Sequence, residues 1–213
     1  MTNNNFQGWN LVKLSAITII SLFILILIFH GINEPSMRIA IRLTARTSCI
    51  LFLLAFSATF FRRLKSNRST QWLLRNRRYL GLSMAVSHGF HAIAIIGAVM
   101  LSTGEIPTDN HGGNLGYFFI IAMTITSFSY PASFLGDRGW KILHTVGMYY
   151  LWLAFIVTFS EKLSESMVIY LPFVSLLIVA ITLRLIVPLI KKKTDLNIER
   201  SVMYSNPIFN CEN

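Results

Sequence analysis

Six long apolar stretches, separated by short polar segments, organise this chain. They cover residues 9–32, 38–61, 79–101, 115–135, 140–159 and 167–190. Each is close to the roughly 20 residues that an α-helix needs to cross the hydrocarbon layer of a bilayer. Backbone groups in lipid must be satisfied within the segment, and the stretches lack the alternation of a β-barrel strand. The pattern therefore predicts an all-α polytopic membrane protein, a bundle of six transmembrane helices.

The composition agrees with lipid as the solvent, because 54% of the residues are hydrophobic and only 13% are charged. A soluble domain carries about 25% charged residues. The chain starts Met-Thr-Asn-Asn-Asn, without the basic start of a signal peptide, so we expect the first stretch to be a retained span. We predict one transmembrane domain over residues 1–193 and a short polar cytoplasmic tail over 194–213.

The net charge is +10, and most of the basic residues lie outside the apolar stretches. The segment between the second and third stretches holds seven basic residues and no acidic one. They are Arg62, Arg63, Lys65, Arg68, Arg75, Arg77 and Arg78. Lys and Arg collect on the cytoplasmic side of membrane proteins, so both termini are predicted to be cytoplasmic. Charge placed in this way follows membrane topology and argues against nucleic-acid binding.

The histidines inside the apolar stretches are the candidate functional residues. Ionisable side chains within a span are costly and need a reason, and neutral imidazole is a common metal ligand. His88 and His91 are three apart, so they share one face of the third span, and His144 lies in the fifth. One alternative is a buried histidine that hydrogen-bonds a neighbouring helix. His30 and His111 lie at a span end and in a polar turn, where a metal role is not expected.

These three histidines suit a b-type heme. Such a heme needs one or two axial imidazoles, apolar walls and basic groups for its propionates. Two axial histidines leave no open position on the iron, which favours electron transfer over catalysis. A zinc site would need about four close ligands, and no acidic residue shares these spans. The chain has no CxxCH motif, so covalently attached heme is not expected.

The depth of each histidine gives an expectation for which pair shares a heme. At about 1.5 Å per residue, His88 lies about 14 Å past the start of its span, His91 about 18 Å and His144 about 6 Å. His88 is the closer match to His144 on this count. Neither His88 nor His91 lies at the same depth as His144 unless the helices are tilted.

Three arginines start the second span at a spacing of four, which places Arg38, Arg42 and Arg46 on one helix face. Arg46 is about two turns inside. It either extends its charge to the headgroups or pairs with an anion such as a heme propionate. Arg184, in the sixth span, is expected to extend to the inner interface.

Three further residues carry simple expectations. Pro131 falls inside the fourth stretch, where it should kink the helix because its nitrogen cannot donate a hydrogen bond. Cys49 lies in a span and Cys211 in the tail, so no disulfide is expected.

Three short stretches resemble the ferric reductase-like transmembrane domain superfamily. They are 44–48 (Thr-Ala-Arg-Thr-Ser), 77–82 (Arg-Arg-Tyr-Leu-Gly-Leu), and 135–144 (Leu-Gly-Asp-Arg-Gly-Trp-Lys-Ile-Leu-His). His91 follows ten residues after Gly81. Within the superfamily, the chain is most similar to the heme-binding membrane subunit of the bacterial periplasmic methionine sulfoxide reductase system.

This resemblance implies six helices in a bacterial inner membrane, b-type heme as a cofactor, and electron passage from the cytoplasmic to the outer side. It carries His91 and His144 over as heme-iron ligands. It carries Arg46, Arg77 and Arg78 over as basic positions near the heme edges. The protein would then be the heme-binding membrane component of an oxidoreductase.

The sequence departs from the family at one ligand. Relatives often carry a second fifth-span histidine about thirteen residues after the first, where this chain has Val157 and then Thr158. His88 is an extra histidine. One heme, held by His144 with His88 or His91, is therefore the expectation.

No GxGxxG motif follows a strand, and no soluble flavin or nicotinamide domain is expected. The electron donor would be a quinol or a separate flavoprotein, with FMN or a quinone bound through that partner or at the inner-side loop. Two alternatives remain beside the redox interpretation. One is a non-redox membrane partner or assembly factor with a degenerate heme site. The other is a small transporter, which the lack of acidic residues in the spans disfavours.

Overall fold

The computed structural model describes the chain over residues 6–104 and 111–205. Its helices are α1 (Trp9–His30), α2 (Glu34–Leu64), α3 (Arg68–Arg75), α4 (Arg77–Thr103), α5 (His111–Ile125), α6 (Ser129–Glu161), the short 3₁₀ turn η2 (Lys162–Ser164) and α7 (Met167–Ser205). Within those two ranges the chain contains no strand, which confirms the all-α prediction. Among the described residues five helices are long and apolar enough to cross a membrane, and α5 is a shorter apolar helix. The chain is thus a multi-pass membrane protein.

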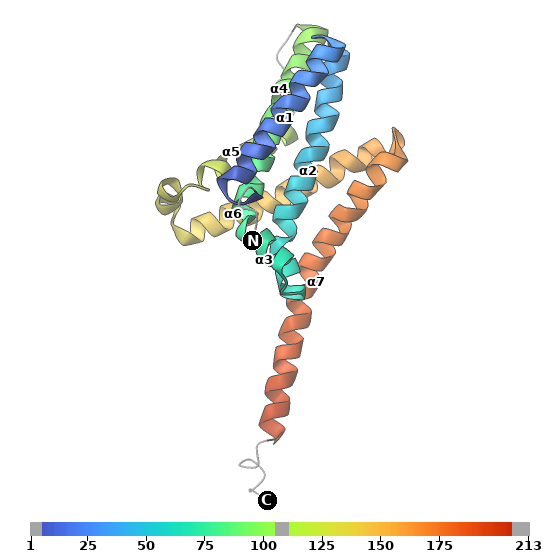
Figure 1. The fold of residues 1–213 in the computed structure, drawn as a ribbon. Helices are drawn as coiled ribbons and strands as arrows, with labels where there is room; N and C mark the ends of the chain where they lie inside the picture. The colour runs from blue at the N-terminus through green and yellow to red at the C-terminus, as the bar shows by residue number, and fades with distance from the viewer. Residues whose placement is uncertain (1–5, 105–110, 206–213) are drawn as a thin grey trace, which may run out of the picture.

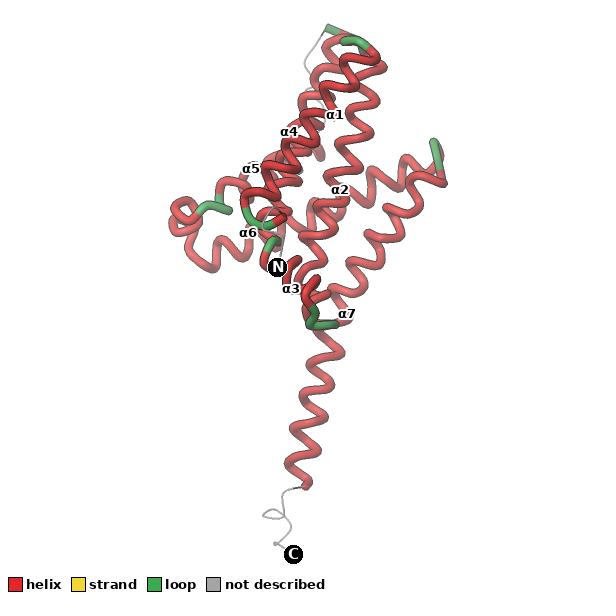
Figure 2. Tube along the Cα trace, viewed as in Figure 1, coloured by secondary structure: helices red, strands yellow, loops and turns green. Residues whose placement is uncertain are grey.

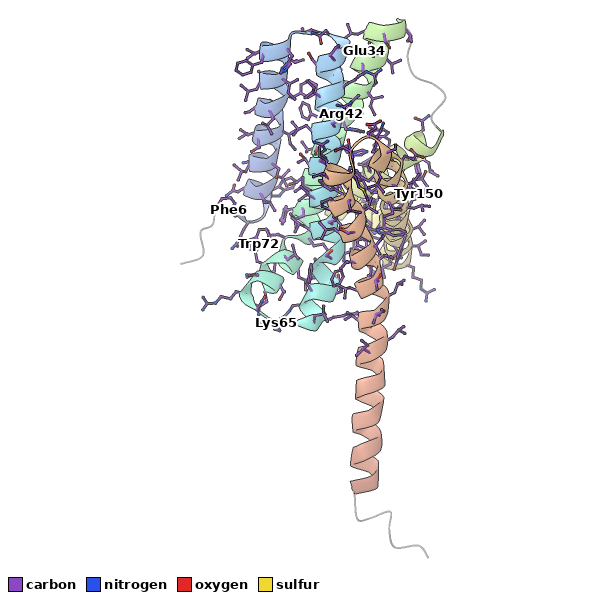
Figure 3. All side chains as sticks on the ribbon, turned by 90° about the vertical axis from the view of Figure 1, so that its right-hand side faces the viewer. Phe6, Glu34, Arg42, Lys65, Trp72 and Tyr150 are labelled. Carbon is purple, nitrogen blue, oxygen red and sulfur yellow. The ribbon has the colours of Figure 1, made fainter. Side chains whose placement is uncertain are left out.

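Helices α1, α2 and α4 stand side by side, with α2 packed most extensively on α4 (Figure 1). Helix α6 crosses behind them at a steep angle, and α7 returns along α2 and extends past the other helices. The connections are short and lie at the ends of the helices (Figure 2). Figure 3 shows Glu34 at one end of the bundle and Lys65 and Trp72 at the other.

Local sequence explains the sharp turn between α1 and α2. Gly31 ends α1 with a φ of 74°, a conformation that glycine adopts without strain. Asn33 then caps α2, because its side-chain oxygen accepts a hydrogen bond from the Ser36 backbone nitrogen at 3.0 Å. The two helices therefore run antiparallel.

The core lies where α2, α6 and α7 meet, and Phe52, Phe56, Phe155, Phe159 and Leu177 fill it. Lipid is as apolar as these side chains, so close packing and polar contacts hold the helices together. Between α2 and α4 the Ser48 hydroxyl donates to the Ser87 hydroxyl at 2.9 Å, and Ser87 donates to the Thr44 carbonyl at 3.2 Å.

The structure corrects the predicted fourth stretch. α5 ends at Ile125, and α6 begins at Ser129, so the apolar stretch 115–135 contains a turn. Pro131 lies in the first turn of α6, where a missing backbone N–H costs little. The kink occurs instead at Gly136, with φ 68° and ψ 166°. The prediction of a Pro131 kink within one continuous helix was wrong.

The C-terminal segment is more regular than expected, because α7 continues as a helix to Ser205. This covers much of the predicted tail, and residues 206–213, with Cys211, lie outside the described residues. Cys49 is buried and unbridged.

Candidate functional site

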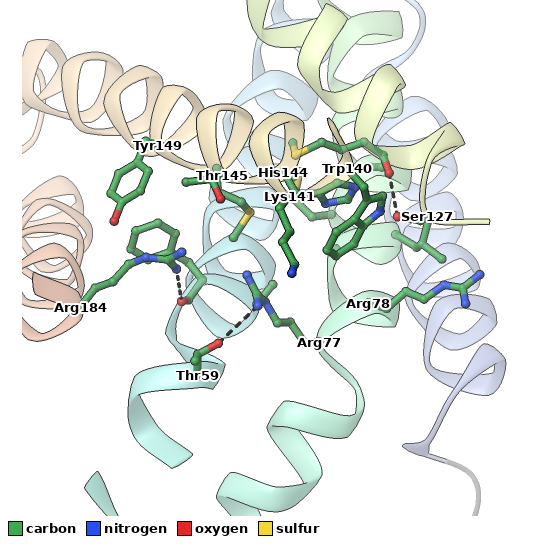
Figure 4. Close-up of a pocket in the computed structure, with 18 of the residues that line it drawn as sticks. Thr59, Arg77, Arg78, Ser127, Trp140, Lys141, His144, Thr145, Tyr149 and Arg184 are labelled. Carbon is green, nitrogen blue, oxygen red and sulfur yellow. Dashed lines mark hydrogen bonds between the residues drawn. The ribbon is translucent and has the colours of Figure 1, made fainter. Parts of the chain in front are cut away.

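A cavity of about 520 Å³ lies between five helices, α2, α4, α5, α6 and α7 (Figure 4). The polar residues that line it come from every one of these helices. They are Thr59 and Arg63 (α2), Arg77 and Arg78 (α4), Thr124 (α5), Ser127 (the turn between α5 and α6), Lys141, His144 and Thr145 (α6), and Arg184 (α7). Apolar side chains such as Phe56, Met84, Ile120 and Met148 complete the wall. The cavity is thus an amphiphilic pocket at one end of the spans.

The described charged side chains that line this cavity are all positive. Five cationic side chains line it, and no described acidic side chain does. Arg77 donates from Nη1 to the Thr59 hydroxyl at 3.3 Å. Arg184 donates from Nη1 to the Phe56 carbonyl at 2.9 Å. These neutral acceptors do not offset the positive charge of Arg77 and Arg184, which are half-buried, while Arg63, Arg78 and Lys141 are exposed. An anionic ligand would complete the site.

His144 is held firmly at this cavity. Its ring stacks on Trp140 with centroids 4.2 Å apart, and its Nε2 lies 3.1 Å from the Thr126 hydroxyl oxygen. Thr126 donates its single proton to the Ala122 carbonyl at 2.7 Å, so the hydrogen-bond network assigns the donor to His144 Nε2. A metal bound through Nε2 would replace the Thr126 contact.

His91 has a different arrangement. Its Nδ1 lies 3.2 Å from the Ile41 carbonyl oxygen and 3.1 Å from the Thr44 hydroxyl oxygen. Thr44 already donates to the Ala40 carbonyl at 2.7 Å, so Nδ1 carries the proton. The ring therefore has Nε2 left as its basic nitrogen. Metal-ligating histidines are usually held in this way through the other ring nitrogen.

His88 lies beside His91, with ring centroids 4.9 Å apart. Its Nδ1 is buried and has no hydrogen-bond partner within the described part of the chain, and the hydroxyl of Tyr117 is in the same situation. The ring centroids of His88 and Tyr117 are 5.2 Å apart. A buried polar group without a partner is rare and calls for an explanation, such as a bound ligand or water.

The structure separates His144 from the His88–His91 pair. The ring of His88 contacts Phe155 of α6, with centroids 6.0 Å apart, and Phe155 follows His144 by eleven residues. Eleven residues of helix span about 16 Å. His88 and His91 are not among the residues that line the cavity. The depth count that matched His88 with His144 is not reproduced.

Val157, the position of the missing family ligand, is 47% exposed. It lies on the outward face of α6, while Phe155 faces α4. Where α6 meets His88, the α6 residue in contact is Phe155, which cannot ligate iron. No α6 histidine therefore takes the place of the one missing at 157.

The predicted arginines divide between two places. Arg77 and Arg78 line the cavity beside His144. Arg46 instead packs on α7: it donates from Nη2 to the Tyr170 hydroxyl at 3.3 Å, and its guanidinium lies 5.2 Å from that ring's centroid. Its buried Nε has no partner among the described residues.

Sequence reasoning missed Arg63, Lys141 and Arg184 as residues of the site. One signal could have found Arg184. It is a cation within a span that has no acidic partner in the same stretch, and such residues usually face a cavity. Arg63 and Lys141 carry no such signal, because basic residues at span ends are ordinary.

The residues at the cavity fit a b-type heme that has one axial histidine. His144 would supply the imidazole, the apolar wall would pack on the macrocycle, and Arg77 and Arg78 would contact the propionates. The volume lies within the roughly 300–1,000 Å³ of small-molecule sites. The described residues bring no three of His, Cys, Asp and Glu together.

Comparisons with protein-family models, with curated proteins and with solved structures find no match to this chain.

Proposed function

We propose that the protein is a membrane-embedded b-type heme protein that transfers electrons across the bilayer. One observation supports this most strongly. The cavity combines a fixed histidine, an apolar wall and the cations Arg77 and Arg78, with no described acidic side chain among its lining residues. This is the set of groups that an amphiphilic dianionic macrocycle requires.

We assign the axial position to His144 and the propionate contacts to Arg77 and Arg78. Trp140 fixes the plane of the imidazole by stacking, and the apolar wall limits the access of water. The heme, when bound, supplies a one-electron redox couple. His91, with its basic Nε2, is the second candidate axial ligand, and His88 is its neighbour on α4.

We further propose six crossings with both termini in the cytoplasm of a bacterial cell. Five helices line one cavity, α5 among them, and α2, α4, α6 and α7 each contribute basic side chains to it. The N-terminal segment joins the same end, because Trp72 Nε1 donates to the Phe6 carbonyl at 2.9 Å. The rule that Lys and Arg stay inside then makes this end cytoplasmic.

The topology predicts the side from which introduced cysteines react. In a background without Cys49 and Cys211, Lys65→Cys should react with a membrane-impermeant maleimide only after the cells are opened. Glu161→Cys should react in intact cells, because it lies at the other end of the spans. Labelling of both positions from outside would refute the proposed topology.

The proposed route runs from a cytoplasmic-side quinol or flavoprotein to an acceptor outside. The basic end of the bundle suits an anionic donor. Rings in mutual contact lead away from the cavity: Tyr149–Phe56 at 6.1 Å, Phe56–Phe52 at 5.2 Å and Phe52–Phe155 at 5.2 Å between centroids. Phe155 then meets His88 at 6.0 Å. This packed path gives a continuous connection between the two histidine locations.

Heme content tests the proposal. Protein purified from cells supplied with a heme precursor should contain about one b-type heme per chain, extractable into acidified organic solvent because no thioether bonds hold it. Purified protein that remains heme-free, and takes up none when titrated with hemin, would refute the heme assignment.

A second function is favoured by one specific contact. His144 Nε2 already bonds Thr126, and Val157 faces outward, as expected of a degenerate heme site. We propose as the alternative a non-redox membrane partner or assembly factor. It predicts that His144→Ala leaves both the heme content and the phenotype of the host unchanged.

A further inference from the structure

Arg184 occupies the end of the cavity away from His144. Its guanidinium lies over the Phe56 ring at 4.3 Å and near the Tyr149 ring at 5.2 Å. The bond from Nη1 to the Phe56 carbonyl fixes its orientation. Figure 4 shows it on the opposite side of Lys141 and Arg77 from Trp140. The guanidinium is therefore held in place with N–H groups left over.

Two more cations reach the same space. Figure 4 shows Lys141 pointing from α6 toward Arg77, with Arg184 extending from the α7 side. The structure describes two ion pairs, Arg38 with Glu34 and Lys162 with Glu165. Neither of them includes Arg77, Lys141 or Arg184. Arg77 and Arg184 are half-buried side chains of like charge that line one cavity, so an anion bound beside them would reduce their repulsion.

The surroundings indicate the chemistry of that anion. A guanidinium and an ammonium together suit a phosphate group, which arginine binds through paired N–H donors. Phe60, Leu82 and Pro188 line the cavity with apolar surface. On α7, Leu185 and Leu189 follow the cavity residues Arg184 and Pro188 in the sequence and are 54% and 66% exposed. A phosphate attached to acyl chains fits this combination of charged and apolar surfaces.

We propose that Lys141 and Arg184 bind the phosphodiester headgroup of an anionic phospholipid at this end of the cavity. The acyl chains would lie along the exposed apolar face of α7. The site does not rest on the heme proposal. It accounts for Arg184, a cation for which heme binding at His144 has no need.

Lipid retention tests the site. Protein in mild detergent is mixed with phosphatidylglycerol or phosphatidylcholine, and bound lipid is counted by native mass spectrometry. Wild type should retain phosphatidylglycerol at least about ten-fold better than phosphatidylcholine, and Arg184→Gln should lose that preference. Arg62→Gln is the matched control, because it removes the same charge at the same end from a residue outside the cavity. Arg62→Gln should retain the wild-type preference.

Three further results decide the interpretation. Arg184→Lys should keep part of the preference, which separates a lost anion contact from misfolding, and far-UV circular dichroism should be equal for all variants. Equal retention by wild type and Arg184→Gln would overturn the proposal. Wild type is also tested with inorganic phosphate. If it retained inorganic phosphate and showed no preference for phosphatidylglycerol, the proposal that the bound anion is a lipid would be overturned.

Heme is followed separately by its absorbance in the same samples. Arg184→Gln should leave it unchanged. A heme-free protein that still prefers phosphatidylglycerol would refute only the heme assignment, and a heme-loaded protein without the preference would refute only the lipid site.

Discussion

Replacing His144 with alanine is expected to remove the heme from the purified protein and leave the helices in place. His144 is the one histidine among the residues that line the cavity, and loss of an axial ligand removes the strongest bond to the cofactor. Changes to groups that only orient a ligand already cost about 10–100-fold in metal affinity. Heme per protein, measured after gel filtration, should therefore fall at least about ten-fold.

The matched control is His30→Ala. His30 ends α1 and is exposed to solvent or headgroups, so this variant should keep the wild-type heme content. Circular dichroism should show unchanged helicity in both variants. Full heme content in His144→Ala would move the ligand to His91, and His91→Ala then becomes the deciding variant.

Replacing Gly147 with valine is expected to separate α5 from α6 and destabilise the cavity. A Cβ at this position would lie 2.8 Å from the Met123 sulfur and 3.2 Å from the Phe119 ring carbon Cδ1. Met123 can bend away, but the Phe119 ring and the second methyl group of valine leave less room. Overpacking of this kind typically costs about 1–3 kcal/mol.

Thermal unfolding in detergent measures this effect, and the midpoint should fall for Gly147→Val. Gly89→Val is the matched control, because a Cβ there meets nothing within 4 Å. Both variants carry the same change in helix propensity, so their difference reports the packing. Equal midpoints would mean that α5 does not pack on α6 at Gly147.

The apolar stretches made most helices predictable. Span hydropathy reports which residues tolerate lipid, and the ends of α2 and α4 lie within a few residues of those predicted. Hydropathy does not report a turn between two apolar segments. The turn after Ile125 was therefore missed. A kink was predicted at Pro131, whereas the structure has it at Gly136.

The candidate site was predictable in its chemistry and less so in its geometry. The residue type pointed to His144 and the resemblance to Arg77 and Arg78, and the fold brings all three to one cavity. Counting residues from the predicted span starts could not show which histidines lie at the same depth. The fifth span was counted from Trp140, but α6 begins eleven residues earlier and crosses the bundle steeply. Arg184 was missed because a sequence does not show which face of α7 meets Phe56.

The optical spectrum of the purified wild-type protein tests the heme assignment most directly. The protein is oxidised with ferricyanide, reduced with dithionite, and the difference spectrum is recorded. The proposed heme predicts the sharp α and Soret bands of a b-type cytochrome, which should be lost in His144→Ala and kept in His30→Ala. A flat difference spectrum from fully folded protein, prepared from heme-sufficient cells, would contradict it.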